Sequence, residues 1–319
     1  MTKYVIKRIL LMLFTFFVIV TICFMLVRIL PRTLPTDKNL AAIMEARWEA
    51  LGYNEPLLVQ YGIYLRGIFT EWDFGTSWYV QQMKPAWDVI VGRLAPTVLV
   101  NLYSFIFSIP IGIALGVVAA IKKNKWPDHT ISTLVMLFVS IPVYVYAFLV
   151  QYIFCYLLDW FPLTVSSLTD AGGSWFSPTM FWSMMPAVIA LSFGQIAGLT
   201  RFTRAELTET LTSDYMLLAR TKGLKKSQAI SRHALKNAMV PILPMIISTF
   251  ISILGGSMII EQIFSVPGVG QLYIQSINMR DYDVFMMDTI FYTFVGLLAG
   301  IVVDISYGFI DPRIRMGEK

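Results

Sequence analysis

The sequence predicts an all-α protein that crosses a membrane several times, and three observations support this. Of the 319 residues, 56% are hydrophobic and only 14% are charged, and the mean hydropathy is +0.66. Uncharged runs of membrane-spanning length recur along the chain, and many basic residues gather between them. A soluble domain of this size needs far more polar surface, so the composition excludes that class.

Six membrane-spanning helices are predicted, because a span needs about 20 mostly apolar residues. The predicted spans are residues 9–27, 97–121, 130–158, 184–200, 238–260 and roughly 285–307. Lys3, Lys7 and Arg8 precede the first run as in a signal peptide, but no small-residue cleavage site follows it. We therefore expect this run to be retained as a span.

The distribution of lysine and arginine predicts that both termini lie in the cytoplasm. Six spans put both ends on one side, which would then hold 17 of the 25 basic residues. Positive charge in short loops marks the cytoplasmic face. The predicted protein is a multi-pass protein of the plasma membrane. It has an N-terminal span (1–30), an extracytoplasmic segment (31–96), a five-span core (97–310) with a cytoplasmic loop (201–237), and a cytoplasmic tail (311–319).

The extracytoplasmic segment is predicted to carry short helices. An apolar stripe with helical spacing runs from Leu40 to Leu51, and Gly52 follows it as a residue that can end a helix. Pro56 and Pro85 can each begin a further helix. The tryptophan and tyrosine residues of this segment favour anchoring at the membrane surface.

Residues 212–244 form a basic, polar stretch between apolar segments. They are predicted to fold as two short helices joined at Gly223. Thr212 or Ser213 can cap the first helix, and Asp214 places an acid in its first turn, where the helix dipole favours it.

The sequence also predicts how the first of these helices ends. Lys222 lies in its last turn, Gly223 can adopt the left-handed conformation, and Leu224 can then fold back on Ala219. Ser227 is expected to cap the second helix. That helix should continue until the next two prolines disturb it.

This stretch resembles the cytoplasmic loop, with a Glu-Ala-Ala core, of ABC-importer permeases of the dipeptide and oligopeptide branch. The matching residues are Asp214-Tyr215, Ala219-Arg220-Thr221-Lys222-Gly223-Leu224 and Arg232-His233-Ala234-Leu235-Lys236-Asn237-Ala238. Leu217 stands where the family has the acid, so no role of that acid carries over. The resemblance implies the fold of a type I ABC-importer permease.

Further matches extend the resemblance from Tyr4 to Arg315. They lie in residues 73–77, 261–270, 280–282 and 311–313. Another departure follows the first span, where the family often has Pro-Gly-Asp-Pro and this chain has Pro-Arg-Thr-Leu-Pro at 31–35.

The resemblance implies a permease subunit of an ATP-driven importer of oligopeptides or dipeptides. Nickel chelates or oligosaccharides are alternative substrates of the same importer type. The implied partners are a second permease subunit in a heterodimer, two ABC ATPase subunits and an extracytoplasmic solute-binding protein. ATP and Mg would bind to the ATPase subunits, so this chain is expected to hold no cofactor and to be no enzyme. The extracytoplasmic helices would then offer an additional docking platform for the binding protein.

The resemblance assigns coupling to the ATPase to the loop around Gly223. The predicted coupling residues are Asp214, Leu217, Leu218, Ala219, Arg220, Lys222, Gly223 and Leu224. The alternative interpretation of the same stretch is a basic amphipathic hairpin that lies on anionic membrane lipid.

An outer gate on the side of the binding protein is predicted after the fifth span. Pro267 and Gly268 predict a turn that leads the chain back towards the pore mouth. Phe264 is the bulky apolar group placed to plug that mouth, and Glu261 is the nearest charge to meet a substrate. The alternative is a plain connection between the fifth and sixth spans.

No catalytic site, metal site or nucleic-acid partner is predicted. The sequence has no phosphate-binding G-x-x-x-x-G-K-[ST] loop, and its two histidines, His129 and His233, lie 104 positions apart in loops. Cys23 and Cys155 lie within apolar runs, which suits a packing role.

The rival functional class is an ion-coupled secondary carrier. Such carriers keep ionisable groups near the membrane midplane, whereas here Asp288 and Asp304 lie towards the ends of the sixth span. Asp304 is predicted to pair with a basic residue. The candidate partners are Arg201, Arg204 and Arg313.

Small residues and prolines predict features of the spans. Gly112-x-x-x-Gly116 and Gly194-x-x-x-Gly198 indicate close helix packing, and contacts within one subunit are the simpler explanation. Pro142 can kink the third span.

Overall fold

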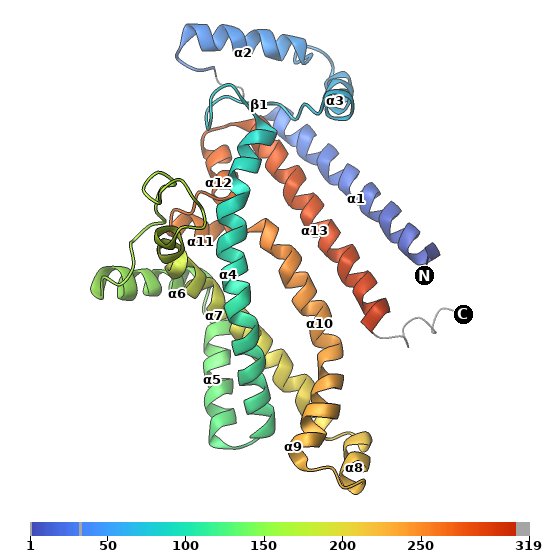
Figure 1. Cartoon of the computed structure of the whole chain (residues 1–319). Helices are drawn as coiled ribbons and strands as arrows, with labels where there is room; N and C mark the ends of the chain where they lie inside the picture. The colour runs from blue at the N-terminus through green and yellow to red at the C-terminus, as the bar shows by residue number, and fades with distance from the viewer. Residues whose placement is uncertain (1, 32–33, 311–319) are drawn as a thin grey trace.

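The computed structural model describes residues 2–31 and 34–310, and its regular structure is almost entirely helical (Figure 1). The first half contains α1 (Thr2–Ile29), α2 (Lys38–Ala50), α3 (Leu57–Arg66), β1 (Thr76–Ser77), β2 (Lys84–Pro85), α4 (Ala86–Ile121), α5 (Trp126–Ser140) and α6 (Val143–Val150). The second half contains α7 (Pro178–Leu211), α8 (Asp214–Thr221), α9 (Lys226–Ala229), α10 (Leu235–Ser252), α11 (Met258–Ile263), α12 (Val269–Asn278) and α13 (Tyr282–Ile310).

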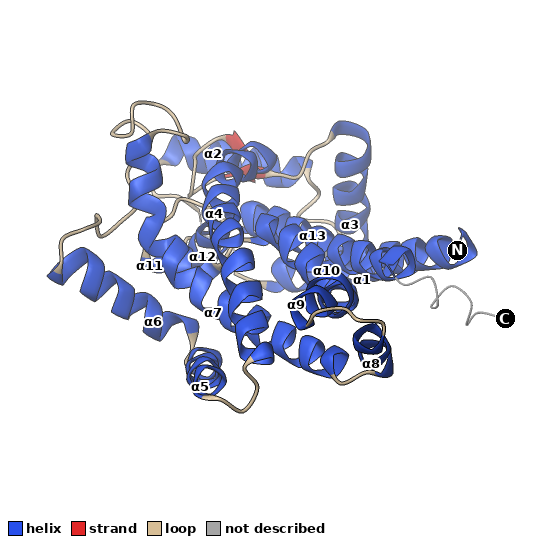
Figure 2. Ribbon diagram, turned by 60° about the horizontal axis from the view of Figure 1, so that its bottom comes forward, coloured by secondary structure: helices blue, strands red, loops and turns tan. Residues whose placement is uncertain are grey.

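Shorter helical turns extend several of these helices. The π-helical turns are Gly67–Glu71 after α3, Gln151–Leu157 after α6 and Ile230–Ala234 before α10. A 3-10 turn, Ile253–Gly255, follows α10. The strands form an antiparallel pair in which Thr76 lies opposite Pro85 and Ser77 opposite Lys84, drawn in red in Figure 2.

Five helical segments of the described chain are long and apolar enough to cross a membrane. They are Val5–Ile29, Ala86–Ile121, Pro178–Leu211, Lys226–Gly255 and Tyr282–Ser306. The predicted third span is instead a pair, Trp126–Ser140 and Val143–Leu157, bent by 104°. Counted as one broken span, this pair completes the six spans that the sequence predicts.

The break in the third span lies at Pro142. Ile141 has extended backbone (φ −82°, ψ 128°), which is the conformation favoured before a proline. Pro142 then precedes α6 and has no N–H to continue the hydrogen bonds of α5. The prediction of a single helix over residues 130–158 is therefore wrong, although the kink at Pro142 is confirmed.

The second span begins earlier than predicted. The helix expected to begin at Pro85 and the span expected over 97–121 form one helix, α4, of 36 residues. At 1.5 Å per residue it is about 54 Å long, more than the hydrocarbon layer needs. Pro96 and Pro110 lie inside it, because a proline can bend a helix without ending it.

The fifth span differs from its prediction at both ends. The chain stays helical through Pro241 and Pro244, so these prolines do not end the helix. It stops at Gly255, before the predicted end at Ile260. Gly256 has φ +63° and ψ −168°, a conformation essentially restricted to glycine, and α11 is a separate helix after it.

α4 and α7 pack closely along the middle of the molecule, and two glycines of α4 lie at the contact. A Cβ at Gly112 would lie 3.0 Å from Cβ of Leu199. A Cβ at Gly116 would lie 2.6 Å from Cβ of Thr203, so alanine does not fit there. The Thr200 hydroxyl also donates to the Gly112 carbonyl at 3.2 Å. The predicted close packing at Gly112 and Gly116 is therefore a contact within this subunit.

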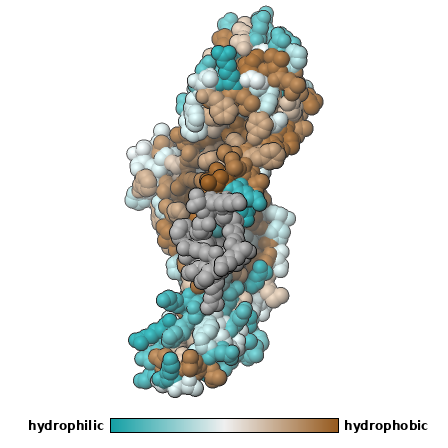
Figure 3. Space-filling model, turned by 90° about the vertical axis from the view of Figure 1, so that its right-hand side faces the viewer, coloured by the Kyte–Doolittle hydropathy of each residue, from teal (hydrophilic) through white to brown (hydrophobic). Residues whose placement is uncertain are grey.

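The two ends of the molecule differ from its middle. α2 and α3 lie at one end with β1, and α8 and α9 lie at the other (Figure 1). A hydrophobic band occupies much of the face in Figure 3, and hydrophilic residues dominate the end that carries α8 and α9. This pattern suits a protein whose middle is surrounded by lipid.

Candidate functional site

The turn after α8 has the geometry that the sequence predicts. Gly223 has φ +84°. Its N–H donates to the carbonyl of Arg220 at 3.0 Å, and the N–H of Leu224 donates to the carbonyl of Ala219 at 3.3 Å. These two bonds are those of the glycine-ended Schellman motif. Apart from the two adjacent residues, no heavy atom of the described residues lies within 4 Å of the position that a Cβ on Gly223 would take, so the backbone conformation alone calls for glycine.

The α8–α9 hairpin shares a small buried cluster, made mainly of alanine, with α4, α7 and α10. Met216 and Ala219 of α8 are the buried members from that helix. The cluster comprises Ala120, Leu207, Met216, Ala219, Ala229, Ala234 and Ala238. Because alanine lets helix backbones approach closely, the hairpin rests directly on α4, α7 and α10.

The opposite face of α8 is exposed and apolar. Leu217 is 64% exposed, Leu218 is 55% exposed and Tyr215 is 40% exposed. Of the predicted coupling residues, Asp214, Leu217, Leu218, Arg220, Lys222 and Gly223 are exposed, Leu224 is half-buried and Ala219 is buried. The sequence prediction left Met216 out of the site, although its three-residue spacing from Ala219 marks both as one helical face.

Two details of the hairpin differ from the sequence prediction. Ser213 occupies the N-cap position of α8, but its hydroxyl donates to the carbonyl of Thr210 at 2.6 Å rather than capping the helix. The second helix is capped at Lys225, whose N–H donates to the side-chain carbonyl of Gln228 at 3.1 Å. Ser227 lies inside α9, so its prediction as the cap is wrong.

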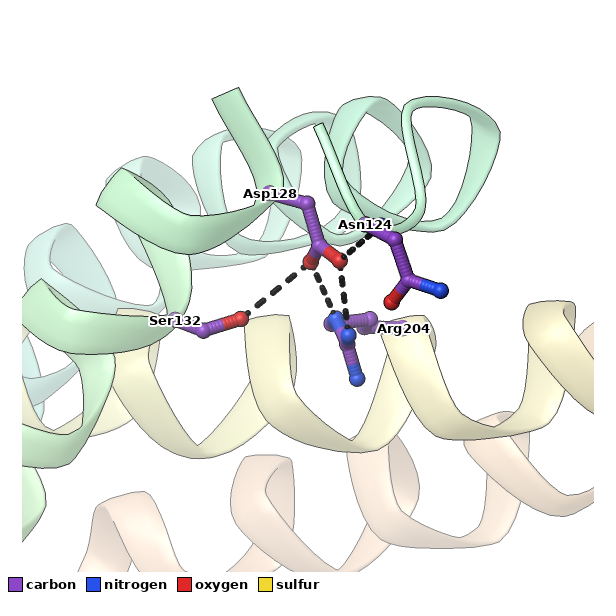
Figure 4. Close-up of polar contacts among 4 residues, drawn as sticks. All are labelled: Asn124, Asp128, Ser132 and Arg204. Atoms are coloured by element: carbon purple, nitrogen blue, oxygen red, sulfur yellow. Dashed lines mark hydrogen bonds and ion pairs between the residues drawn. The ribbon is translucent and has the colours of Figure 1, made fainter. Parts of the chain in front are cut away.

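An ion pair ties the turn between α4 and α5 to α7 (Figure 4). Nε and Nη2 of Arg204 donate to the two carboxylate oxygens of Asp128, at 2.5 and 2.8 Å. The backbone N–H of Asn124 and the hydroxyl of Ser132 also donate to this carboxylate, at 2.8 and 3.2 Å. Asp128 is buried, and the guanidinium group of Arg204 balances its charge through two parallel hydrogen bonds.

Asp304 has a different partner from those predicted. Its carboxylate pairs with Nη1 of Arg8 at 2.9 Å, which joins α13 to α1. Arg204 is engaged by Asp128, and Arg201 is exposed. Arg313 lies outside the described residues. Sequence spacing could not identify Arg8, because the contact depends on how α1 packs against α13.

Glu261 lies at the joint between α4, α11 and α12. Its side chain is buried, and its carboxylate accepts the Thr97 hydroxyl at 3.0 Å and the Gln271 N–H at 2.9 Å. The same Thr97 oxygen accepts the Val269 N–H at 2.8 Å. Burial raises the pKa of the Glu261 carboxyl, and the hydrogen bonds partly oppose this shift.

Three glycines make room for this carboxylate. A Cβ at Gly256 or Gly268 would overlap the Glu261 carboxylate, and one at Gly270 would come within 3.0 Å of it. The glycines in and before the 261–270 segment therefore serve the enclosure of one buried acid. Glu261 stabilises a joint here, which is a role that the sequence prediction did not include.

Phe264 is also buried, in a cluster that includes Val150, Met184 and Val188. The chain turns between α11 and α12, but the turn lies at Phe264 and Ser265, where Ser265 has φ +52°. Pro267 follows this turn, and Gly268, with extended backbone, is the N-cap of α12. The assignment of Glu261 and Phe264 to an outer gate stays a prediction, and in this conformation both side chains are enclosed by their own subunit.

A further buried acid, Asp281, clasps the segment before α4 to the turn between α12 and α13. One oxygen of Asp281, Oδ2, accepts four donors from the end of β1 and the loop after it. They are the hydroxyl of Ser77 at 2.7 Å and the N–H groups of Trp78, Tyr79 and Val80 at 3.1, 2.9 and 2.9 Å. One carboxylate oxygen thus accepts all four donors, and this holds residues 77–80 against the turn between α12 and α13.

Asp283 strengthens the same clasp. Its Oδ2 accepts the N–H of Thr76 at 3.1 Å. Gly75, at φ +100°, passes so close that a Cβ would lie 2.5 Å from Cγ of Asp283. The segments 73–77 and 280–282, which the resemblance picked out separately, thus meet in space.

Two family models cover most of the chain. Residues 112–316 match the model described as the inner membrane component of binding-protein-dependent transport systems. Residues 1–100 match the model for the N-terminal part of the membrane component of such systems.

Several curated proteins resemble the chain along its whole length. The dipeptide transport system permease protein of Lactococcus lactis subsp. cremoris (strain MG1363) is 36% identical, covering 99% of this chain and 100% of that protein. The dipeptide transport system permease protein of Bacillus subtilis (strain 168) is 33% identical, with 100% of each chain covered. The glutathione transport system permease protein of Escherichia coli (strain K12) is 32% identical, with 99% of each covered.

One solved structure shares the fold. It is an inward-facing form of the MetNI methionine ABC transporter, with a TM-score of 0.56 and 16% identity over 70% of this chain and 97% of that one. The described helices thus have the fold of a type I ABC-importer permease. Together with the two family matches, this shows that the chain belongs to the family of inner membrane components of binding-protein-dependent transport systems.

Proposed function

We propose that this chain is the permease subunit of an ATP-driven importer of dipeptides or oligopeptides. The observation that carries the proposal is the exposed apolar face of α8, presented by a hairpin that is packed onto three of the long helices. The names of the relatives support the substrate, because two are permeases for dipeptides and one is a permease for glutathione, a tripeptide. Nickel chelates and oligosaccharides remain the alternative substrates.

The α8 face is the docking surface for an ATPase subunit. Leu217 and Leu218 form its apolar centre, and Arg220 and Lys222 add positive charge beside it. An apolar centre with a polar rim is the usual composition of a protein interface. ATP and Mg are bound by two ATPase subunits, and this chain transmits their closure through α8 to the helices below it.

The remaining partners and the orientation follow from the same assignment. α8 faces the cytoplasm and the clasped segment 37–85 faces outward, as the distribution of basic residues predicts. The clasp at Asp281 holds residues 77–80, which follow the outer helices, against the α12–α13 turn, where a solute-binding protein docks. A second, different permease completes the pathway, and the complex lies in the plasma membrane.

The test compares two leucine substitutions in the complete complex. Leu217→Asp puts an uncompensated charge at the centre of the docking face, and we expect loss of most of the copurifying ATPase and of peptide uptake. Leu168→Asp is the matched control, because Leu168 is an exposed leucine in the loop before α7. Normal ATPase binding by the Leu217 variant would contradict the proposal. If the Leu217 variant instead keeps its ATPase but binds anionic vesicles more weakly than the parent does, the hairpin lies on membrane lipid.

A second candidate function is ion-coupled transport, and one observation favours it. Asp288 is fully buried, and neither of its carboxylate oxygens has a hydrogen-bond partner among the described residues. Carriers use such groups to bind protons. Under ATP-driven import, Asp288→Asn should leave uptake within about twofold of the parent, since asparagine has nearly the same shape and the Asp288 carboxylate has no hydrogen-bond partner to lose among the described residues. Uptake that requires Asp288 and collapses with the proton gradient would instead establish the ion-coupled carrier.

A further inference from the structure

A cavity lies between α4, α7 and α10. Its volume is about 110 Å³, and its lining is mostly apolar, with polar side chains at three places. The lining residues are Ser108, Ile109, Gly194, Gln195, Gly198, Leu199, Met245, Ile246 and Thr249. A cavity needs about 10–15 Å³ to hold one water molecule, so this one has room for several waters or a small chemical group. Ser108 and Gln195 come from the central parts of α4 and α7, which places the cavity away from the ends of these spans.

Glycine keeps the cavity open on the side of α7. Beyond the local backbone of α7, no heavy atom in the described part of the chain lies within 4 Å of the position that a Cβ on Gly198 would take. Gly194 is more confined, because a Cβ there would lie 3.0 Å from the Tyr146 hydroxyl. Of the Gly194-x-x-x-Gly198 pair, only Gly194 thus serves close packing, whereas Gly198 borders empty space.

The polar groups of the cavity carry no net charge. The side-chain oxygen of Gln195 accepts the Ser104 hydroxyl at 3.2 Å, which leaves the two N–H donors of its amide nitrogen to offer. The Ser108 hydroxyl donates to the carbonyl of Ser104 at 2.6 Å, and the Thr249 hydroxyl donates to the carbonyl of Met245 at 2.9 Å. Their oxygens therefore remain available as acceptors.

We infer that this cavity is a contact site for the backbone of the transported peptide, an inference that rests on the proposed function. A peptide unit is neutral and carries one donor and one acceptor, and the cavity lining offers neutral donors and acceptors. A charged lining would select peptides by the charge of their side chains. Contacts to the backbone suit a path through which peptides of different sequence pass.

Labelling of an introduced cysteine tests whether the peptide reaches the cavity. Cys23 and Cys155 are first replaced by alanine, and Gly198→Cys is then introduced into the complete complex in vesicles. We expect a small thiol reagent to label this cysteine during ATP turnover, and a transported dipeptide to slow labelling at least about fivefold. Val188→Cys is the control, because Val188 is buried on the same helix and should stay unlabelled. Labelling of Gly198→Cys that the dipeptide does not slow would overturn the inference.

Two further substitutions test the contact itself. Gln195→Leu removes the amide donors, and we expect the KM for dipeptide uptake to rise about tenfold, the effect of one lost hydrogen bond. ATPase stimulation by the binding protein should remain, because the outer end and α8 are unchanged. Gly198→Leu fills the cavity and should reduce uptake more strongly, with normal assembly.

The outcomes separate this inference from the proposed function. A parent complex that transports dipeptide while both variants match its uptake and KM would overturn the cavity assignment alone. A parent complex that binds its ATPase but transports no peptide would overturn the proposed substrate, and this inference with it.

Discussion

At Gly223 the backbone adopts φ +84°, and this turn sets the angle between α8 and α9. Replacement by valine should cost about 1 kcal/mol or more locally, because a β-branched residue is disfavoured at positive φ. We expect Gly223→Val to leave membrane insertion intact and to uncouple ATP hydrolysis from uptake, measured as the ratio of the two rates. Asn tolerates positive φ better, so Gly223→Asn should retain most of the coupling. Uptake at the parental rate in the valine variant would show that the turn is not part of the coupling element.

The buried carboxylate of Glu261 is expected to stabilise the fold through its hydrogen bonds. Glu261→Ala would leave the donors of Thr97 and Gln271 without their acceptor in a buried site. We expect a loss of about 2–4 kcal/mol in the free energy of unfolding, measured by denaturant titration in detergent. Gln262→Ala is the control, since the adjacent Gln262 is exposed, and it should change stability little.

The sequence predicted Gly223 correctly and left the surroundings of Glu261 unrecognised, for a physical reason. The turn at Gly223 is closed by hydrogen bonds within four to six residues, so local sequence contains all of its determinants. The enclosure of Glu261 needs Thr97, which is 164 positions away. The sequence does show three glycines near Glu261, but their role becomes clear only when the structure places them against its carboxylate.

Among the elements, the ion pair between Asp128 and Arg204 joins the start of the broken span to the helix that leads into α8. Arg204→Ala would leave Asp128 charged and buried, and we expect a loss of about 2–3 kcal/mol, since the arginine itself is partly exposed. Asp128→Asn together with Arg204→Ala should be less harmful than the sum of the two single changes. A double-mutant cycle of unfolding free energies measures this coupling, and additive effects would contradict it.

The helices themselves were largely predictable, because their lengths follow from uncharged runs. Their breaks were less so. Pro142 interrupts the third span, whereas Pro110 and Pro244 lie inside continuous helices. A proline removes one hydrogen bond in each case, and the packing around it decides whether the helix bends or ends. Sequence alone does not contain that packing.

For the whole molecule, the contacts that join distant segments were the least predictable. Asp281 accepts four donors from residues more than 200 positions away, and Arg8 meets Asp304 across the first and last long helices. Both contacts fix the N-terminal part of the chain on the core.

The orientation of the molecule is open to a direct test. Lys225 borders the α8–α9 hairpin, and Glu49 lies on α2 at the other end of the molecule (Figure 1); both are exposed. In a chain without Cys23 and Cys155, Lys225→Cys should resist a membrane-impermeant thiol reagent in intact cells and react after lysis, whereas Glu49→Cys should react in both. The reason for this expectation is the concentration of positive charge on the α8 side, which favours a cytoplasmic position for that side. Labelling in the opposite order would place α8 outside the cell, where it could not meet an ATPase, and the proposed coupling would fail with the topology.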